Sequence, residues 1–203
     1  NGKRRKDKLN FPVGRVRSMF LYPLSFSEFL HGTGNEMLRD YLNQEKEMPP
    51  STHERLLEIY KSFLVIGGMP EAVSAFLDTG SILECQKVHR DIVINFMDDF
   101  QKYDSPMPPD ILKRVFDFAA HHVCSQVKSS SAVEGVSAYI FNESIDLLHR
   151  AGLIHPVRAS SCDVIPLGSA GKETNKKLIL FDTGVYLTHC GLDAASLMAS
   201  QIF

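Results

Sequence analysis

The sequence predicts a mainly α-helical protein, in which a helical bundle is followed by a winged-helix-like domain with a small β-hairpin. Apolar residues recur at three- or four-residue steps over long stretches, and a Ser-to-Glu spacing typical of helix N-termini occurs three times. Two apolar runs of strand length follow, both after position 150. With 203 residues, of which 44% are hydrophobic, the chain can bury the core of one large domain or two small ones.

Three capping boxes mark the first helix starts, because a Ser and a Glu three residues later can each bond a free backbone amide of the other. They are Ser25 to Glu28, Ser51 to Glu54 and Ser81 to Glu84. The second box opens a helix with one apolar stripe, and the third opens a longer helix whose apolar face runs for about five turns. The stripes consist of Leu56, Ile59, Tyr60, Phe63 and Leu64 in the shorter helix, and of Cys85, Val88, Ile92, Phe96, Phe100 and Tyr103 in the longer one.

Prolines divide these helices into subdomains, because proline cannot donate a backbone amide and biases the preceding residue toward extended geometry. Pro49-Pro50 and residues 106–109 are the two expected joints. A helical pattern resumes after the second joint and stops near His122. A polar Ser/Lys stretch from Ser125 to Ser131 follows.

The last predicted elements follow the order of a winged helix. A helix over about Val136 to Arg150 ends before Gly152, a residue type that favours a helix C-terminus. The apolar runs Leu153 to Val157 and Lys177 to Phe181 predict two strands, joined by a long loop that contains proline and glycine. Two helices followed by a hairpin with a long tip are typical of a winged helix. Residues 192–203 are expected to begin a linker or a further helix.

Composition narrows the class of protein. A formal net charge of -2 and a pI near 6.5 argue against a dedicated nucleic-acid-binding protein, which is usually basic. The four cysteines are scattered without a C-x-x-C pair, which fits a reducing cytoplasm. No apolar run approaches the roughly 20 residues that span a bilayer, so we expect a soluble cytoplasmic protein. The basic run at residues 1–8 is interpreted as a solvated loop, with a nuclear-targeting or nucleic-acid patch as the alternative.

Two patterns imitate catalytic or metal sites. Asp182 and Gly184 belong to a D-T-G sequence that resembles an aspartic protease, but that chemistry needs a small all-β domain. We interpret Asp182 as the cap of a short helix, with Gly184 easing the turn. His121, His122 and Cys124 lie at neighbouring helical positions with no further ligand at a useful spacing, so no metal site is predicted.

Arg15 is the first candidate site residue. It precedes an apolar segment, a proline turn and the first capped helix. In an oligomeric or domain-closing ATPase, an arginine placed there can neutralise charge on a transferred γ-phosphate. The alternative is a surface ion pair.

The sequence Gly67-Gly68-Met69-Pro70 is the second candidate, because it joins the end of one helix to the start of another. Pro70 falls at the first helical position, which proline favours. The glycines permit a close backbone approach, and a helix N-terminus offers free amides to an anion. A ligand-free turn between helices would use the same residue types.

A nucleic-acid surface is a further hypothesis, since the second helix of a winged helix enters the major groove and the wing touches phosphates. The wing loop supplies Lys172, Lys176 and Lys177, and the presumed recognition helix supplies Arg150. That helix also carries two carboxylates, Glu143 and Asp146, which repel phosphate. A winged helix that serves as a protein–protein joint is therefore the competing interpretation.

Six short motifs occur in an order that resembles a known family, the prokaryotic AAA+-like ATPases that carry a C-terminal domain of unknown function. The similarity runs over about residues 11–192, nearly the whole chain. The motifs are G-R at 14–15, Y-P-L-S-F-x-E-F-L at 22–30, G-G-M-P-E-A-V at 67–73, D-F-x-K-Y at 99–103, A-G-L-I at 151–154 and L-F-D-T-G-V at 180–185.

The resemblance implies a P-loop ATPase core, a helical lid, a winged-helix-like region and a nuclease-like C-terminal domain. Residues 1–24 then correspond to the tail of the ATPase core, 25–104 to the lid, 105–190 to the winged-helix-like domain and 191–203 to a linker toward the C-terminal domain. Arg15 would lie near the arginine-finger position. Gly67, Gly68 and Pro70 would form the lid turn that touches nucleotide.

The sequence also departs from that family, because it contains no G-x-x-x-x-G-K-[ST] phosphate loop and no nuclease-like core. We therefore expect a middle piece of a larger protein, with no catalysis of its own. ATP and Mg²⁺ would bind in the parent protein, and the P-loop and C-terminal domains would be its partners, with an oligomer as a further expectation. The alternative is a free-standing winged-helix DNA-binding regulator.

Overall fold

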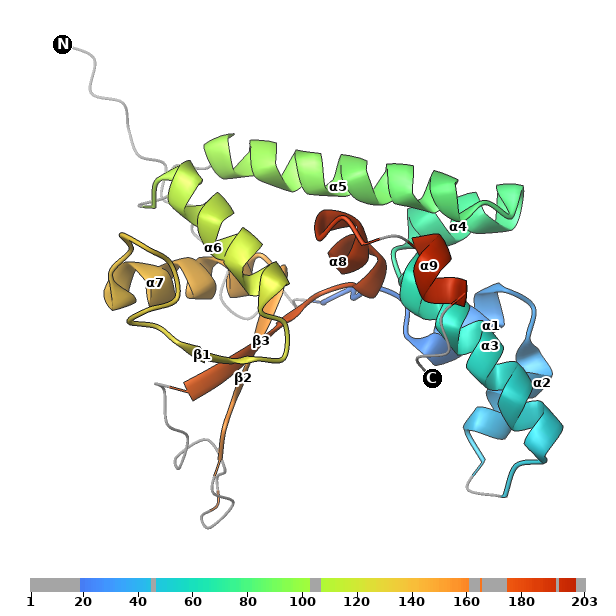
Figure 1. Cartoon of the computed structure of the whole chain (residues 1–203). Helices are drawn as coiled ribbons and strands as arrows, with labels where there is room; N and C mark the ends of the chain where they lie inside the picture. Colours follow the sequence, from blue (N-terminus) through green and yellow to red (C-terminus); the bar gives the residue numbers. More distant parts are fainter. Residues whose placement is uncertain are drawn as a thin grey trace.

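The computed structural model describes residues 19–44, 47–102, 107–160, 165, 175–192 and 194–199, and it is mainly helical with a small antiparallel sheet. Figure 1 shows the arrangement of the elements. The helices are α1 (Phe26–Gly32), α2 (Glu36–Leu42), α3 (Pro50–Ile66), α4 (Pro70–Thr79), α5 (Ile82–Lys102), α6 (Pro109–His121), α7 (Ala138–Arg150), α8 (Thr183–His189) and α9 (Ala194–Ala199). The strands are β1 (Gln126–Lys128), β2 (Ile154–Arg158) and β3 (Asn175–Leu180).

The predicted capping boxes had different outcomes. At α1 the box is confirmed, because the Ser25 hydroxyl accepts from the Glu28 amide and the Glu28 carboxylate accepts from the Ser25 amide. The box predicted at Ser51 is wrong. Helix α3 begins at Pro50 with Pro49 as its N-cap, two residues earlier than a box at Ser51 predicts, so Ser51 lies inside the first turn and no side chain caps the helix. Helix α5 begins directly after Ser81, as expected, and its Glu84 carboxylate accepts from Lys87.

The two serines should respond differently to substitution. We expect Ser25→Ala to lower the free energy of unfolding by about 1 kcal/mol, because it removes a helix cap. Ser51→Ala should change it by less than about 0.5 kcal/mol. Urea denaturation of both variants measures the difference, and equal losses would contradict the assignment of the caps.

The sheet has three strands, where the sequence predicted a two-stranded hairpin. Strand β3 lies in the centre and pairs antiparallel with β1 on one side and with β2 on the other. The polar stretch around Ser125 contains β1, in which Val127 is buried between two exposed neighbours. A strand of three residues with one buried side chain carries too little periodicity to be recognised in a sequence.

Two hydrophobic clusters share the long helix α5. Phe29, Ile66, Ala72, Val73 and Cys85 form one cluster around α1, α3, α4 and the start of α5. The other cluster joins the end of α5 to α6, α7 and the sheet, and its largest fully buried side chains are Phe116, Phe141, Leu148, Ile145, Ile154, Leu178 and Val115. In Figure 1, α5 runs along both groups of elements, and α8 lies beneath it between them.

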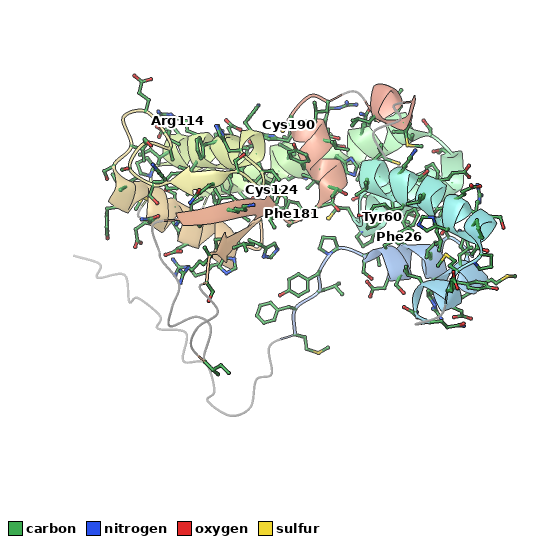
Figure 2. All side chains as sticks on the ribbon, turned by 60° about the horizontal axis from the view of Figure 1, so that its bottom comes forward. Phe26, Tyr60, Arg114, Cys124, Phe181 and Cys190 are labelled. Atoms are coloured by element: carbon green, nitrogen blue, oxygen red, sulfur yellow. The ribbon has the colours of Figure 1, made fainter. Side chains whose placement is uncertain are left out.

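Ring contacts continue both clusters toward the surface. Phe26 of α1 and Tyr60 of α3 lie together beside the first cluster, with ring centroids 5.1 Å apart. Phe181, directly after β3, packs against Phe96 of α5 with ring centroids 5.6 Å apart. Figure 2 labels Phe26, Tyr60 and Phe181 on their respective parts of the protein. Within the described ranges, no helix is both long enough and apolar enough to cross a membrane.

The C-terminal part of the chain packs against the earlier helices α3 and α5. Gly152 follows α7 with a positive φ of 78°, which agrees with the predicted C-terminal glycine. After β3, helix α8 contacts α3 and α5. Helix α9 contacts α3, so the segment expected to begin a linker or a further helix contains a packed helix.

Candidate functional site

The Gly67–Gly68 turn lies at the centre of a buried joint, formed by Ile66, Gly67, Gly68, His89, Asp182, Gly184 and Thr188. Gly67 ends α3 with a φ of 73°, in the region that favours glycine, and its amide donates to Phe63. Pro70 occupies the first turn of α4, as predicted. The Gly68 carbonyl accepts from the Leu24 amide at 2.7 Å, which fixes the segment that leads into α1.

Asp182 connects this turn to α8. One carboxylate oxygen, Oδ2, accepts from the Gly68 amide at 2.7 Å. The other, Oδ1, accepts from the Val185 amide at 2.9 Å and caps α8, as the sequence predicted. The side chain is 5% exposed, so both bonds are made in a buried environment where hydrogen bonds to a charged group are strong.

Close packing explains why three glycines meet here. A Cβ atom on Gly67 would lie 2.8 Å from Asp182 Oδ2, and one on Gly68 would lie 2.7 Å from the Leu24 nitrogen. A Cβ atom on Gly184 would lie 2.7 Å from both His89 Nε2 and the Ile66 carbonyl oxygen. Real Cβ atoms do not approach other heavy atoms this closely, so any side chain at these positions would force the joint apart.

His89 of α5 fills the space between α3 and α8. Its side chain is fully buried, with Nε2 3.0 Å from the Ile66 carbonyl oxygen and Nδ1 3.2 Å from the Thr188 hydroxyl. The neutral Nε2–H tautomer satisfies both contacts, because Nε2 donates to the carbonyl and Nδ1 accepts from the hydroxyl. Burial lowers the pKa of His89, while the nearby Asp182 carboxylate and the bond to Ile66 oppose that shift.

The buried neutral histidine predicts a dependence of stability on pH. The pKa of His89 is lowered in the folded protein, so below the ordinary value of about 6.5 the unfolded chain binds a proton at His89 and the folded chain does not. The free energy of unfolding is therefore highest above that pH. It decreases as the pH falls, by at most about 1.4 kcal/mol per pH unit. Urea denaturation at several pH values should show a shallower decline for His89→Gln than for the wild type. The exposed His53→Gln is the matched control, and identical slopes for all three proteins would contradict the prediction.

The joint also reaches the second cluster through α8. His189 Nε2 lies 2.9 Å from Asp117 Oδ1 of α6, and its ring packs against Phe116 with centroids 5.0 Å apart. At the joint, α8 is held by its cap Asp182 and by the contact between Thr188 and His89. At α6 it is held by the contact between His189 and Asp117.

The other predicted site residues do not meet at this joint. Arg15 and Lys172 lie outside the described residues. Arg150 is exposed at the end of α7, where its Nε donates to the Asp146 carbonyl. Lys176 is buried, 9% exposed, and its ammonium donates to Asn142 and lies over the Phe141 ring. Lys177 is exposed on the outer face of the sheet.

The comparison with protein families gives one result. Residues 57–196, more than half of the chain, match a domain of unknown function, DUF8612. The chain belongs to the DUF8612 family. The matched residues run from α3 to α9, so both sides of the joint, Gly68 and Asp182, fall within the DUF8612 domain. Neither the curated proteins nor the solved structures gave a match.

Sequence reasoning missed two features of the DUF8612 joint. His89 lies four residues after Cys85, on the predicted apolar stripe of α5, and that position was a signal for burial. The bond from Gly68 to Asp182 spans 114 positions, and no local pattern indicates it.

Proposed function

We propose that this chain is the helical lid and winged-helix-like part of an AAA+-like ATP-binding protein, where it couples nucleotide state to the flanking domains. The observation that carries the proposal is a continuous set of bonds. Leu24 donates to Gly68, Gly68 donates to Asp182, and Asp182 caps α8. In this proposal, a displacement of the segment before α1 reaches α8 through the Gly68 backbone and the Asp182 carboxylate.

The order of elements supports the winged-helix part of the proposal. Helix α6, strand β1, helix α7 and the β2–β3 pair follow one another, and β1 closes the sheet against β3. In this assignment the wing corresponds to the sequence between β2 and β3, most of which lies outside the described residues. Helices α6 and α7 contact each other and pack against the strands.

The test begins with the coding sequence upstream of Asn1, which we expect to encode a strand, a G-x-x-x-x-G-K-[ST] loop and a helix. Calorimetry should then show that the full-length protein binds ATP with Mg²⁺ and that the 203-residue chain does not. Hydrogen exchange of the full-length protein should change on ATP binding at the Gly67–Gly68 turn and at α8. A start codon immediately before Asn1 would exclude this function.

A second candidate, autonomous DNA binding, is supported by the outer face of the sheet. Its described outward positions carry Lys128, Lys177 and His155 and no carboxylate. The exposed part of α7 is less favourable, because it carries Asp146 beside Arg150.

Fluorescence anisotropy with duplex DNA tests the second candidate. Binding should weaken steeply with salt, and Lys177→Ala should reduce the salt slope by about one. Lys61→Ala, on α3, is the control and should leave the slope unchanged. An affinity that does not depend on salt would exclude this candidate.

A further inference from the structure

We propose that a row of aromatic rings beside the outer face of the sheet binds unpaired bases of a single-stranded nucleic acid. The row consists of Phe20 and Tyr22 before α1, His155 of β2 and His149 of α7, and we call it the aromatic row. This inference does not depend on the ATPase proposal. It differs from the duplex DNA candidate in its ligand, because the rings would contact the faces of bases.

Contacts between neighbouring rings hold the aromatic row together. The Phe20 and Tyr22 rings are nearly parallel, with an angle of 21° between their planes and centroids 6.5 Å apart. The row continues from Tyr22 to His155 at 6.3 Å and from His155 to His149 at 5.9 Å between centroids. These separations lie in the range over which aromatic rings attract one another. The row therefore connects the segment before α1 to the sheet and to the end of α7.

The first two rings are open to solvent although their segment is anchored. Phe20 is 79% exposed and Tyr22 is 63% exposed. Two residues after Tyr22, the Leu24 amide donates to the Gly68 carbonyl at 2.7 Å, and on the other side the Tyr22 ring contacts His155. An exposed ring on an anchored segment can accept a planar partner with a smaller loss of conformational freedom than a ring on a free chain.

Positive charge lies on the outer face of the sheet, next to the aromatic row. Leu178 is buried, so its neighbours Lys177 and Ile179 point to the outer face. Ile179 pairs with His155, which makes Lys177 and His155 diagonal neighbours, about 7 to 8 Å apart. Lys128 of β1 lies farther along the same face. The described outward positions of the three strands carry no carboxylate.

Exposed rings beside lysines suit an unpaired strand, because bases stack on the rings while the ammonium groups contact phosphates. In a duplex the bases stack on one another, so their faces are not available to the aromatic row. Helix α7, which would enter a groove of the duplex, also carries the exposed Asp146, and a carboxylate repels phosphate. The aromatic row therefore favours a single strand.

Two other occupants agree less well with this surface. A symmetric dimer through the outer face would bring Lys128 and Lys177 against the same residues of a second copy, where like charges repel. An apolar segment of another protein would contact Leu21 as readily as Tyr22, since Leu21 is 97% exposed. Leu21 has no ring, so Leu21→Ala is the matched control for Tyr22→Ala.

Fluorescence anisotropy of the 203-residue chain tests the inference with three labelled probes. They are an oligothymidylate and an oligouridylate of about 12 nucleotides, and the duplex of the oligothymidylate with its complement. We expect both single strands to bind at least about tenfold more tightly than the duplex. Tyr22→Ala should weaken single-strand binding about tenfold, whereas Tyr22→Phe, which keeps the ring, and Leu21→Ala should stay within about twofold of the wild type. Lys177→Ala should reduce the salt slope by about 0.7.

The same titrations contain the results that would overturn the inference. Equal losses for Tyr22→Ala and Leu21→Ala would assign the segment to an apolar protein partner. A duplex bound as tightly as the single strands, with no effect of Tyr22→Ala, would retain the duplex DNA candidate and exclude the aromatic row. No binding of either single strand at about 100 μM protein would also exclude it. Binding of either single strand through Tyr22 supports the inference, and the tighter of the two identifies the ligand as DNA or RNA.

Discussion

Gly68→Ala is expected to lower the free energy of unfolding by about 3 kcal/mol, one of the largest effects of any single methyl group in this protein. The added Cβ atom would meet the carbonyl oxygen of Leu24 and lie 3.0 Å from its carbonyl carbon. These are backbone atoms, which cannot rotate away as a flexible side chain can. The bond from the Leu24 amide to the Gly68 carbonyl would be lost with the displacement.

Gly32→Ala is the matched control, because no heavy atom lies within 4 Å of its added Cβ and its backbone has no positive φ. Gly32 ends α1, where alanine is the better helix former, so stability should be unchanged or rise by up to about 1 kcal/mol. Thermal and urea denaturation of both variants make the comparison. A loss of less than about 1 kcal/mol for Gly68→Ala would show that the turn can move away from Leu24.

Phe116→Ala is expected to cost about 3 to 5 kcal/mol. Phe116 is fully buried, and its ring faces Phe100 of α5 at 6.5 Å and His189 of α8 at 5.0 Å. Its removal leaves a cavity among α5, α6 and α8. We expect the packed helices and the sheet to keep this cavity from collapsing. Phe20→Ala, at a position 79% exposed, is the control and should change stability by less than about 0.5 kcal/mol in urea denaturation. Equal losses would mean that the second cluster can repack.

The helices were predictable where their own residues carry the signal. Ser25 and Glu28 form the predicted box, Pro70 begins α4, and Asp182 caps α8, because each of these interactions is made within three or four residues. The box at Ser51 failed for a local reason too. Two prolines precede it, and the helix starts at the second of them.

The sheet and the joint were only partly predictable. Strand β1 consists of three residues held by β3, a strand about 50 residues later in the chain, so its own sequence contributes little beyond Val127. The Gly67–Gly68 turn was identified as a special position, but its contact is a carboxylate that arrives from position 182. Glycine pairs indicate that something lies close to the backbone, and only the fold identifies the group.

The 21-residue helix α5 has a consequence for how the protein can be divided. Its first turns carry Cys85 of one cluster, and its last turns carry Phe96 and Phe100 of the other, about 20 Å farther along the same rod. A cut after residue 104 would leave the downstream piece without Phe96 and Phe100, which pack against its cluster. Both hydrophobic clusters therefore depend on α5, and we expect the two parts of the protein to unfold together in a single cooperative transition.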